Sequence, residues 1–229
     1  MPFGVAVVLV PLAGFLVIGL IYFLNGDRRL KRRLRKLPIS TSIAQTPENT
    51  DVRVSGALAY VEGNAPLKAP ISNRPCVAWR VIVEERRSNG KSSSWYKVID
   101  ESDSTGFALE DESGRAIVDG TALNLALDFD ASDDQGMFND GSPELMAFLE
   151  THGVQTHGFL LKKTLRAREG KLEVGERVTV GGIGVFMNDP SAQSGYRGSA
   201  KLLQIRALST GELLVTDDRK ASRGQHRSS

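Results

Sequence analysis

The sequence predicts a mainly β fold of the α+β class: a partly closed β-barrel or sandwich with one short helix, preceded by a single N-terminal transmembrane helix. Three observations lead to this prediction. An uncharged apolar segment occupies residues 3–24, short alternating segments recur between residues 52 and 216, and one helical pattern begins at Ser142.

The N-terminal apolar segment has the length of a membrane span. From Phe3 to Leu24 there are roughly 22 residues without a charge, enough to cross about 30 Å of hydrocarbon as a helix. A cleaved signal peptide is the competing interpretation. No positive charge precedes the segment and no small-x-small cleavage site follows it, so a retained anchor over residues 1–26 is favoured.

A basic segment follows the apolar one directly. It carries seven basic residues against the single acidic Asp27, a net charge of +6, and these residues are Arg28, Arg29, Lys31, Arg32, Arg33, Arg35 and Lys36. Basic residues stay on the cytoplasmic side, so we expect the N-terminus outside and the remainder in the cytoplasm. Near an acidic leaflet each would contribute about 1 kcal/mol, which makes the seven candidate lipid headgroup contacts. Fixing the topology would be a sufficient role by itself.

The folded part is predicted to occupy residues 52–216. The preceding residues 27–51 are interpreted as a basic juxtamembrane segment and a linker, because residues 38–51 are rich in Ser, Thr, Pro and Asn. Within the folded part, alternation or β-branched residues predict strands over residues 52–58, 77–85, 95–99, 107–111, 116–118, 162–168, 178–186, 202–208 and 213–216.

Three of these segments carry more specific signals. Residues 107–118 form a predicted hairpin in which Phe107 and Leu109 point inward. Glycines interrupt residues 178–186, which predicts a bulge or a barrel corner. In residues 77–85, one face is predicted to carry Val77, Trp79, Val81 and Val83.

The single predicted helix lies between an acidic loop and the later strands. Ser142 is a suitable N-cap, Pro143 fits the first helical position, and Gly153 marks the end. The acidic loop covers residues 131–141. Residues 217–229 are predicted to be a disordered tail.

Charge and cysteine content exclude several classes of protein. Residues 37–216 have a net charge of −6, which disfavours nucleic acid as a partner because phosphate neutralisation needs a basic folded surface. The single cysteine, Cys76, excludes a disulfide framework and a thiolate-rich metal site within one chain. As Cys76 opens a strand, it is interpreted as a buried structural residue rather than a nucleophile.

No other group of residues forms a recognisable site. His152 and His157 are five residues apart and lack the spacing of a zinc protease pair. A calcium loop starting at Asp128 fails because Asp133 and Asn139 stand where glycine and glutamate are needed. The glycines after Val180 lack the third glycine of a dinucleotide site. We therefore predict no cofactor, no metal and no catalytic residue.

The pattern of these segments resembles the GIDE domain, also called BAM ("beside a membrane"). The stretches that carry the resemblance include Gly56 and its flanking strand, and the others are residues 67–72, 75–80, 107–118 and 172–182. Together they span about residues 52–190, behind a membrane helix. The family occurs in membrane-anchored E3 ubiquitin ligases of organelles and in prokaryotic proteins of unclear role.

The resemblance implies a module that senses or binds, and it transfers no functional residue. The ligases carry a second membrane helix and a RING finger with about eight Cys/His ligands, and residues 217–229 contain no cysteine. Ligase activity is therefore not implied. We expect a single-pass, membrane-anchored, non-catalytic interaction or scaffolding protein whose partners are the lipid bilayer and an unknown protein.

Three alternatives stay open. One is a component or relative of a membrane E3 ubiquitin ligase system. The second is a hydrolase-type enzyme with its site in the acidic loop, residues 131–141. The third is a carrier of a lipid or small ligand in the mouth of the barrel.

Overall fold

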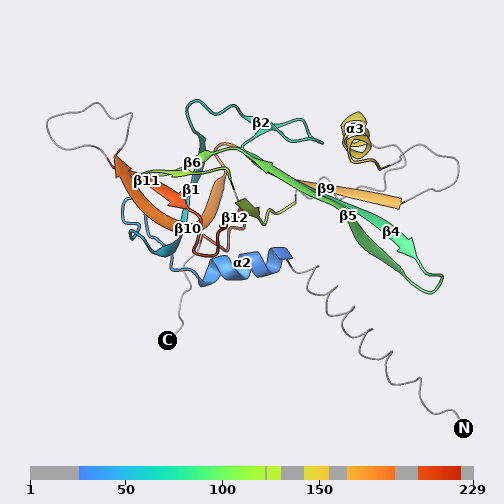
Figure 1. The fold of residues 1–229 in the computed structure, drawn as a ribbon, viewed down its shortest axis with the longest axis horizontal. Helices are drawn as coiled ribbons and strands as arrows, with labels where there is room; N and C mark the ends of the chain where they lie inside the picture. Colours follow the sequence, from blue (N-terminus) through green and yellow to red (C-terminus); the bar gives the residue numbers. More distant parts are fainter. Residues whose placement is uncertain (1–25, 122, 130–141, 155–163, 189–200, 223–229) are drawn as a thin grey trace, which may run out of the picture.

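The computed structural model describes residues 26–121, 123–129, 142–154, 164–188 and 201–222 (Figure 1). The predicted transmembrane anchor, residues 1–26, lies almost wholly outside this set, as do the acidic loop and the last seven residues. Within the described ranges, none of the helices combines the length and the apolar character needed to cross a membrane.

The centre of the fold is a closed, five-stranded mixed β-barrel. Its strands pair in the order β1-β6-β7-β11-β10, and β10 returns to β1 to close it. All neighbours are antiparallel except β7 and β11, as in the Greek-key barrel of an OB-fold. The bounds are β1 Asp51–Tyr60, β6 Phe107–Asp111, β7 Gly114–Val118, β10 Arg177–Asn188 and β11 Lys201–Arg206. Two further strands, β12 (Leu213–Thr216) and β8 (Leu123–Leu125), extend the sheet from β10.

Alternating apolar side chains from every barrel strand fill its interior. Phe107 and Leu109 are fully buried, so the inward orientation predicted for this hairpin is confirmed. Among the other interior residues are Val52, Val54, Leu58, Ala116, Val118, Val178, Val180, Leu203 and Ile205. The prediction of a β-barrel is therefore confirmed, and the barrel is closed rather than partly open.

A second, three-stranded sheet extends from the barrel (Figure 1). Its order is β5-β4-β9, with β4 Ala78–Ser88, β5 Ser93–Ser104 and β9 Thr164–Leu172. Helix α3 (Pro143–Thr151) covers one face, where the rings of Trp79 and Phe148 meet edge to face at 6.5 Å. The oxygen of Ser142 accepts a hydrogen bond from the Leu145 amide at 3.2 Å, which confirms the predicted N-cap.

A small ribbon, β2 (Leu67–Lys68) and β3 (Pro75–Cys76), leads into this sheet. The carboxylate of Glu169 on β9 accepts hydrogen bonds from the amides of Ile71 and Ser72, at 2.7 and 3.0 Å. Glu169 is almost fully buried, and these bonds satisfy its charge while fixing the turn of the ribbon against β9.

A second helix, α2 (Gly26–Lys36), is present where the sequence indicated only a basic segment. The sequence predicted one short helix, whereas the described part of the chain contains two, so this prediction is wrong. Leu30 and Leu34 are buried, and together with Leu37 they pack against Leu214 of β12. A Cβ at Gly181 of β10 would lie 2.6 Å from Cδ1 of Leu34, so the missing side chain at Gly181 makes room for the helix.

The segments on either side of the predicted domain also pack on the barrel. Ile39 forms a bridge with Arg53, and Ile43 is buried in the barrel core. Beyond β12, Ala221 is fully buried beside the leucines of α2. The packed part thus extends beyond the boundaries at residues 52 and 216 that the sequence suggested.

Strand β10 contains the corner that its glycines predicted. One edge of β10 pairs with β12 through Gly181 and then with β11 from Ile183 onward, while the other edge pairs with β1. Gly182 lies where the partner changes. A Cβ there would lie 2.5 Å from the carbonyl oxygen of Arg206 and 2.5 Å from Cγ2 of Ile205. The backbone can approach this closely only because position 182 has no side chain.

We predict that Gly182→Ala lowers the free energy of unfolding by about 1–3 kcal/mol, the usual cost of inserting a methyl group into a packed interior. The matched control is Gly26→Ala, because a Cβ at Gly26 meets nothing within 4 Å. Chemical denaturation of the purified full chain measures both. Equal midpoints for Gly182→Ala and the unaltered protein would show that the corner does not depend on this glycine.

Candidate functional site

The outward face of α2 carries a stripe of free basic side chains. Because Leu30 and Leu34 face the barrel, positions on the opposite side of the helix face solvent. Arg28, Arg32 and Lys36 are spaced four residues apart on that side and are exposed. Their side chains make no hydrogen bond or ion pair with any residue that the structure describes. We call Arg28, Arg32 and Lys36 the basic stripe.

Two other members of the predicted headgroup set point toward the domain instead. Lys31 forms an ion pair with Asp128, and Nη1 of Arg33 lies 2.7 Å from Oε1 of Glu212. Hydrogen bonds from Asn124 and from Arg33 lower the pKa of Glu212. Among the seven basic residues of the prediction, Lys31 and Arg33 therefore hold α2 to the domain, whereas the basic stripe faces solvent.

The remaining two predicted residues lie beside these groups. Nε of Arg35 donates to the carbonyl oxygen of Lys31 at 3.2 Å, within the helix. Arg29 is exposed near the start of the helix. The prediction that all seven residues contact lipid headgroups stays a prediction.

The start of α2 is fixed by Arg80, a residue that the sequence did not single out. Its Nη1 donates to Asp27 at 2.6 Å and to the carbonyl oxygen of Leu125 at 2.7 Å. Its Nε and Nη2 donate to the two carboxylate oxygens of Asp100, at 2.8 and 3.0 Å. The side chain is only 15% exposed. One guanidinium thus joins α2, the second sheet and the end of β8.

This arrangement also fixes the charges at the junction. Burial by itself would lower the pKa of Arg80, but the carboxylates of Asp100 and Asp27 outweigh it and raise the pKa. The pKa of Asp100 is lowered in turn by Arg80 and Lys97, against the opposing effect of burial. Arg80 and Asp100 therefore stay ionised throughout the physiological pH range, and bidentate Arg–carboxylate pairs of this kind are the strong class of ion pair.

The carboxylate of Asp217, whose pKa is raised rather than lowered, lies near the contact between Lys31 and Asp128. Burial raises the pKa of Asp217 to about 6, and the nearby charge of Asp128 adds to the effect. The two oxygens of Asp217 accept the amide of Asp128, at 2.8 and 3.1 Å. The end of β12 is thereby tied to the loop that contacts α2.

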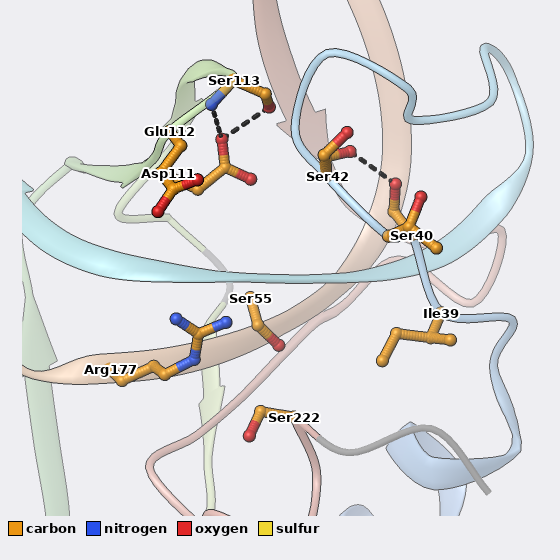
Figure 2. A pocket seen from close by; sticks show the side chains of 10 residues that line it. Ile39, Ser40, Ser42, Ser55, Asp111, Glu112, Ser113, Arg177 and Ser222 are labelled. Carbon is orange, nitrogen blue, oxygen red and sulfur yellow. Dashed lines mark hydrogen bonds between the residues drawn. The ribbon is translucent and has the colours of Figure 1, made fainter. Parts of the chain in front are cut away.

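A polar pocket of about 640 Å³ lies beside the start of the domain (Figure 2). Figure 2 shows the turn residues Asp111 and Ser113 at one end and Arg177 at the other. Hydroxyl groups line much of it, and the lining side chains come from Ile39, Ser40, Thr41, Ser42, Ser55, Asp111, Glu112, Ser113, Arg177 and Ser222.

The two charged ends of the pocket differ in their availability. Asp111 accepts hydrogen bonds from Ser113, from Gly114 and from the amide of Ile43, and these outweigh burial and lower its pKa. Asp111 is therefore committed to the turn. The guanidinium of Arg177 has no such partner within the described part of the chain. The pocket therefore offers the guanidinium of Arg177, the exposed carboxylate of Glu112 and several hydroxyls, which suits the binding of a small polar group.

The other residues considered from the sequence take structural positions. Cys76 is fully buried, and burial together with Glu169 and Glu173 raises its pKa to about 11, which leaves the thiol protonated. His152 ends α3, where its Nδ1 lies 2.7 Å from the Phe148 carbonyl oxygen and its Nε2 contacts Glu101. His157, Asp133 and Asn139 lie outside the described residues.

Comparison with known proteins gave no match: no protein-family model, no curated protein and no solved structure is significantly similar to this chain. The resemblance to the GIDE domain stays a prediction.

The raised pKa of Asp217 generates a prediction about pH. Its folded-state pKa of about 6 exceeds the unfolded value of 3.8, so the folded state binds the extra proton. Stability from this group is therefore gained as the pH falls from above 6 toward 4. We predict that Asp217→Asn raises the free energy of unfolding at pH values above 6, by on the order of 1 kcal/mol after allowance for solvent screening.

Denaturant unfolding of the full chain on either side of pH 6 measures this effect. The amide oxygen of Asn can still accept the Asp128 amide, so the variant should lose part of the pH dependence and keep the fold. Asp218→Asn is the control, since within the described residues the carboxylate of Asp218 accepts only the local Lys220 amide, at 2.9 Å. A wild-type pH profile in Asp217→Asn would contradict the prediction.

Proposed function

We propose that this protein is a membrane-tethered, non-catalytic interaction module that α2 holds beside a bilayer. The N-terminus lies outside and the folded domain lies in the cytoplasm. One observation carries the proposal: α2, which begins two residues after the apolar segment 3–24, is docked on the folded domain and presents its basic stripe outward. Helix and domain are thereby one continuous unit.

The docking of α2 rests mainly on apolar burial. Each fully buried leucine contributes about 1.5–3 kcal/mol, and Leu30 and Leu34 are both buried. The partly exposed pair of Arg33 with Glu212 adds at most about 1 kcal/mol. These contacts set the direction in which the chain leaves the domain. The barrel then faces the membrane with a defined side instead of rotating on a flexible tether.

The polar pocket supports the interaction part of the proposal. Its free guanidinium, Arg177, and the surrounding hydroxyls suit a carboxylate or another polar group of a partner protein. The barrel interior, in contrast, is filled by residues such as Phe107 and Ile205, which argues against a carrier with its ligand in the barrel. The alternative site in the acidic loop, residues 131–141, lies outside the described residues.

The topology is tested by cysteine labelling of the full chain. In a Cys76→Ala background, Ser229→Cys should react with a membrane-impermeant reagent only after cell lysis, because the basic segment stays on the cytoplasmic side. The chain should also resist extraction from membranes by alkaline carbonate. Labelling of intact cells would reverse the orientation, and release by carbonate would remove the anchor from the proposal.

The role of the basic stripe is tested by charge removal. We predict that Arg28, Arg32 and Lys36 changed together to Gln reduce the phosphatidylserine that copurifies with the full chain after mild detergent extraction. Each lost cation removes about 1 kcal/mol of attraction to an anionic leaflet. These side chains form no hydrogen bond or ion pair with any described residue. The midpoint of thermal unfolding should therefore be unchanged.

The matched control changes Lys68, Arg74 and Lys201 to Gln, which removes the same charge from exposed positions elsewhere. The ribbon that carries Lys68 and Arg74 lies on the opposite side of the molecule from α2 (Figure 1). Equal lipid retention by the two triple variants would mean that net charge, rather than the basic stripe, attracts the lipid.

A further inference from the structure

The second sheet has one face that α3 does not cover. Alternation along β4 places Trp79, Val81 and Val83 against α3 and the intervening residues on the other side. Directly paired residues of β5 and β9 share that side with them. We call this the basic sheet face, and it carries Arg80, Arg86, Trp95, Lys97, Arg166 and Arg168 together with Glu84 and Asp100. Five basic residues face two acidic ones there.

Trp95 is held in a fixed position on this face. The guanidinium of Arg166 lies 4.4 Å from the centroid of the Trp95 ring, and its Nε donates to Oε2 of Glu84 at 2.6 Å. Arg168 donates to the same oxygen of Glu84 at 3.2 Å. Glu84 is only 5% exposed, so it orients both arginines from beneath. The indole therefore lies half-buried against a positively charged sheet.

The cations nearest the hairpin tip are available. Nε and Nη2 of Arg86, which is exposed, contact only the hydroxyl of Ser93, at 3.0 and 2.9 Å. Lys91 is exposed in the turn between β4 and β5, and its ammonium group has no partner within the described residues. Neither side chain is neutralised by a carboxylate there.

The position of α2 connects this face with the membrane anchor. The ion pair of Arg80 with Asp27 places the first turn of α2 at the root of the basic sheet face. Figure 1 shows α2 and α3 on opposite sides of the long hairpin β4–β5. At about 3.3 Å per residue, the hairpin reaches roughly 26 Å from Arg80 to Ser88. The chain that leads to the apolar segment therefore departs beside this face.

We propose that the basic sheet face, together with the adjoining hairpin turn, is a second contact with the bilayer, in which Arg86 and Lys91 meet anionic headgroups and Trp95 lies at the headgroup level. This inference rests on the proposed membrane tether. Tryptophan is enriched at that depth because its ring is apolar and its N–H is polar. Basic residues near an anionic leaflet are attracted to it individually. Two contacts, the basic stripe and the basic sheet face, together fix the tilt of the domain.

The experiment uses the full chain in vesicles of phosphatidylcholine and phosphatidylserine in a ratio of two to one. The protein has two tryptophans, so Trp79→Phe leaves Trp95 as the only reporter. Brominated lipids should quench Trp95 strongly in these vesicles and weakly in vesicles of phosphatidylcholine alone. Arg86→Gln should lower the ratio of docked to free hairpin about fivefold, which corresponds to one basic residue near the leaflet.

Arg87→Gln is the matched control, because Arg87 is exposed on the same strand but on the opposite face. Equal quenching in Arg86→Gln and Arg87→Gln would overturn the inference. If Trp79→Phe does not fold, an environment-sensitive dye on Ser92→Cys in the Cys76→Ala background measures the same contact.

The experiments distinguish a failure of the second contact from a failure of the proposed membrane tether. A chain that resists carbonate extraction but leaves Trp95 unquenched retains the anchor and loses the second contact. A chain that carbonate releases fails as a tether. A response of Trp95 to a single-stranded oligonucleotide but not to vesicles would assign the face to nucleic acid and overturn the lipid contact.

Discussion

The arrangement of α2, the second sheet and β8 depends on the hydrogen bonds of one side chain, Arg80. We call these hydrogen bonds the Arg80 fork. Three segments that are distant in the sequence, namely α2, the second sheet and β8, meet at one guanidinium whose side chain is 15% exposed. Asp27 and Asp100 neutralise it, and the Leu125 carbonyl takes a further N–H. Removing Asp27 or Asp100 would leave this largely buried guanidinium with one carboxylate instead of two, which costs more than an exposed ion pair contributes. The fork therefore fixes geometry more than it adds stability.

The contact between the barrel and α2 depends on a different constraint, namely the absence of side chains at two glycines of β10. Gly181 leaves room for Leu34, and the next residue, Gly182, lets β10 approach the backbone of β11. Two adjacent glycines thus serve two purposes on opposite faces of one strand, helix docking outside and barrel closure inside. Any side chain at position 181 or 182 would push apart elements that the fork by itself does not hold together.

Local sequence patterns predicted the elements but not the way they meet. The hairpin containing Phe107 and the helix capped by Ser142 follow from neighbouring residues, and both are present. Helix α2 was not predicted because its segment contains seven basic residues and only two leucines. The four-residue spacing of those leucines was nevertheless a usable signal for a helix. Arg80 was missed because its carboxylate partners are 53 and 20 residues away. The same limit applies to the headgroup set, since only packing separates Lys31 and Arg33 from the basic stripe.

The positions of the charged residues predict an orientation of the domain that its net charge alone does not. Residues 37–216 carry a net charge of −6, which by itself would repel the domain from an anionic leaflet. At physiological salt, however, a charge acts over about 8 Å, so only the side that faces the leaflet contributes. In the proposed tethered arrangement, the basic stripe and the basic sheet face would place positive charge on the side of the domain from which α2 begins. Attraction on that side and repulsion from the acidic remainder would then act in the same sense, and both would turn the domain toward one orientation.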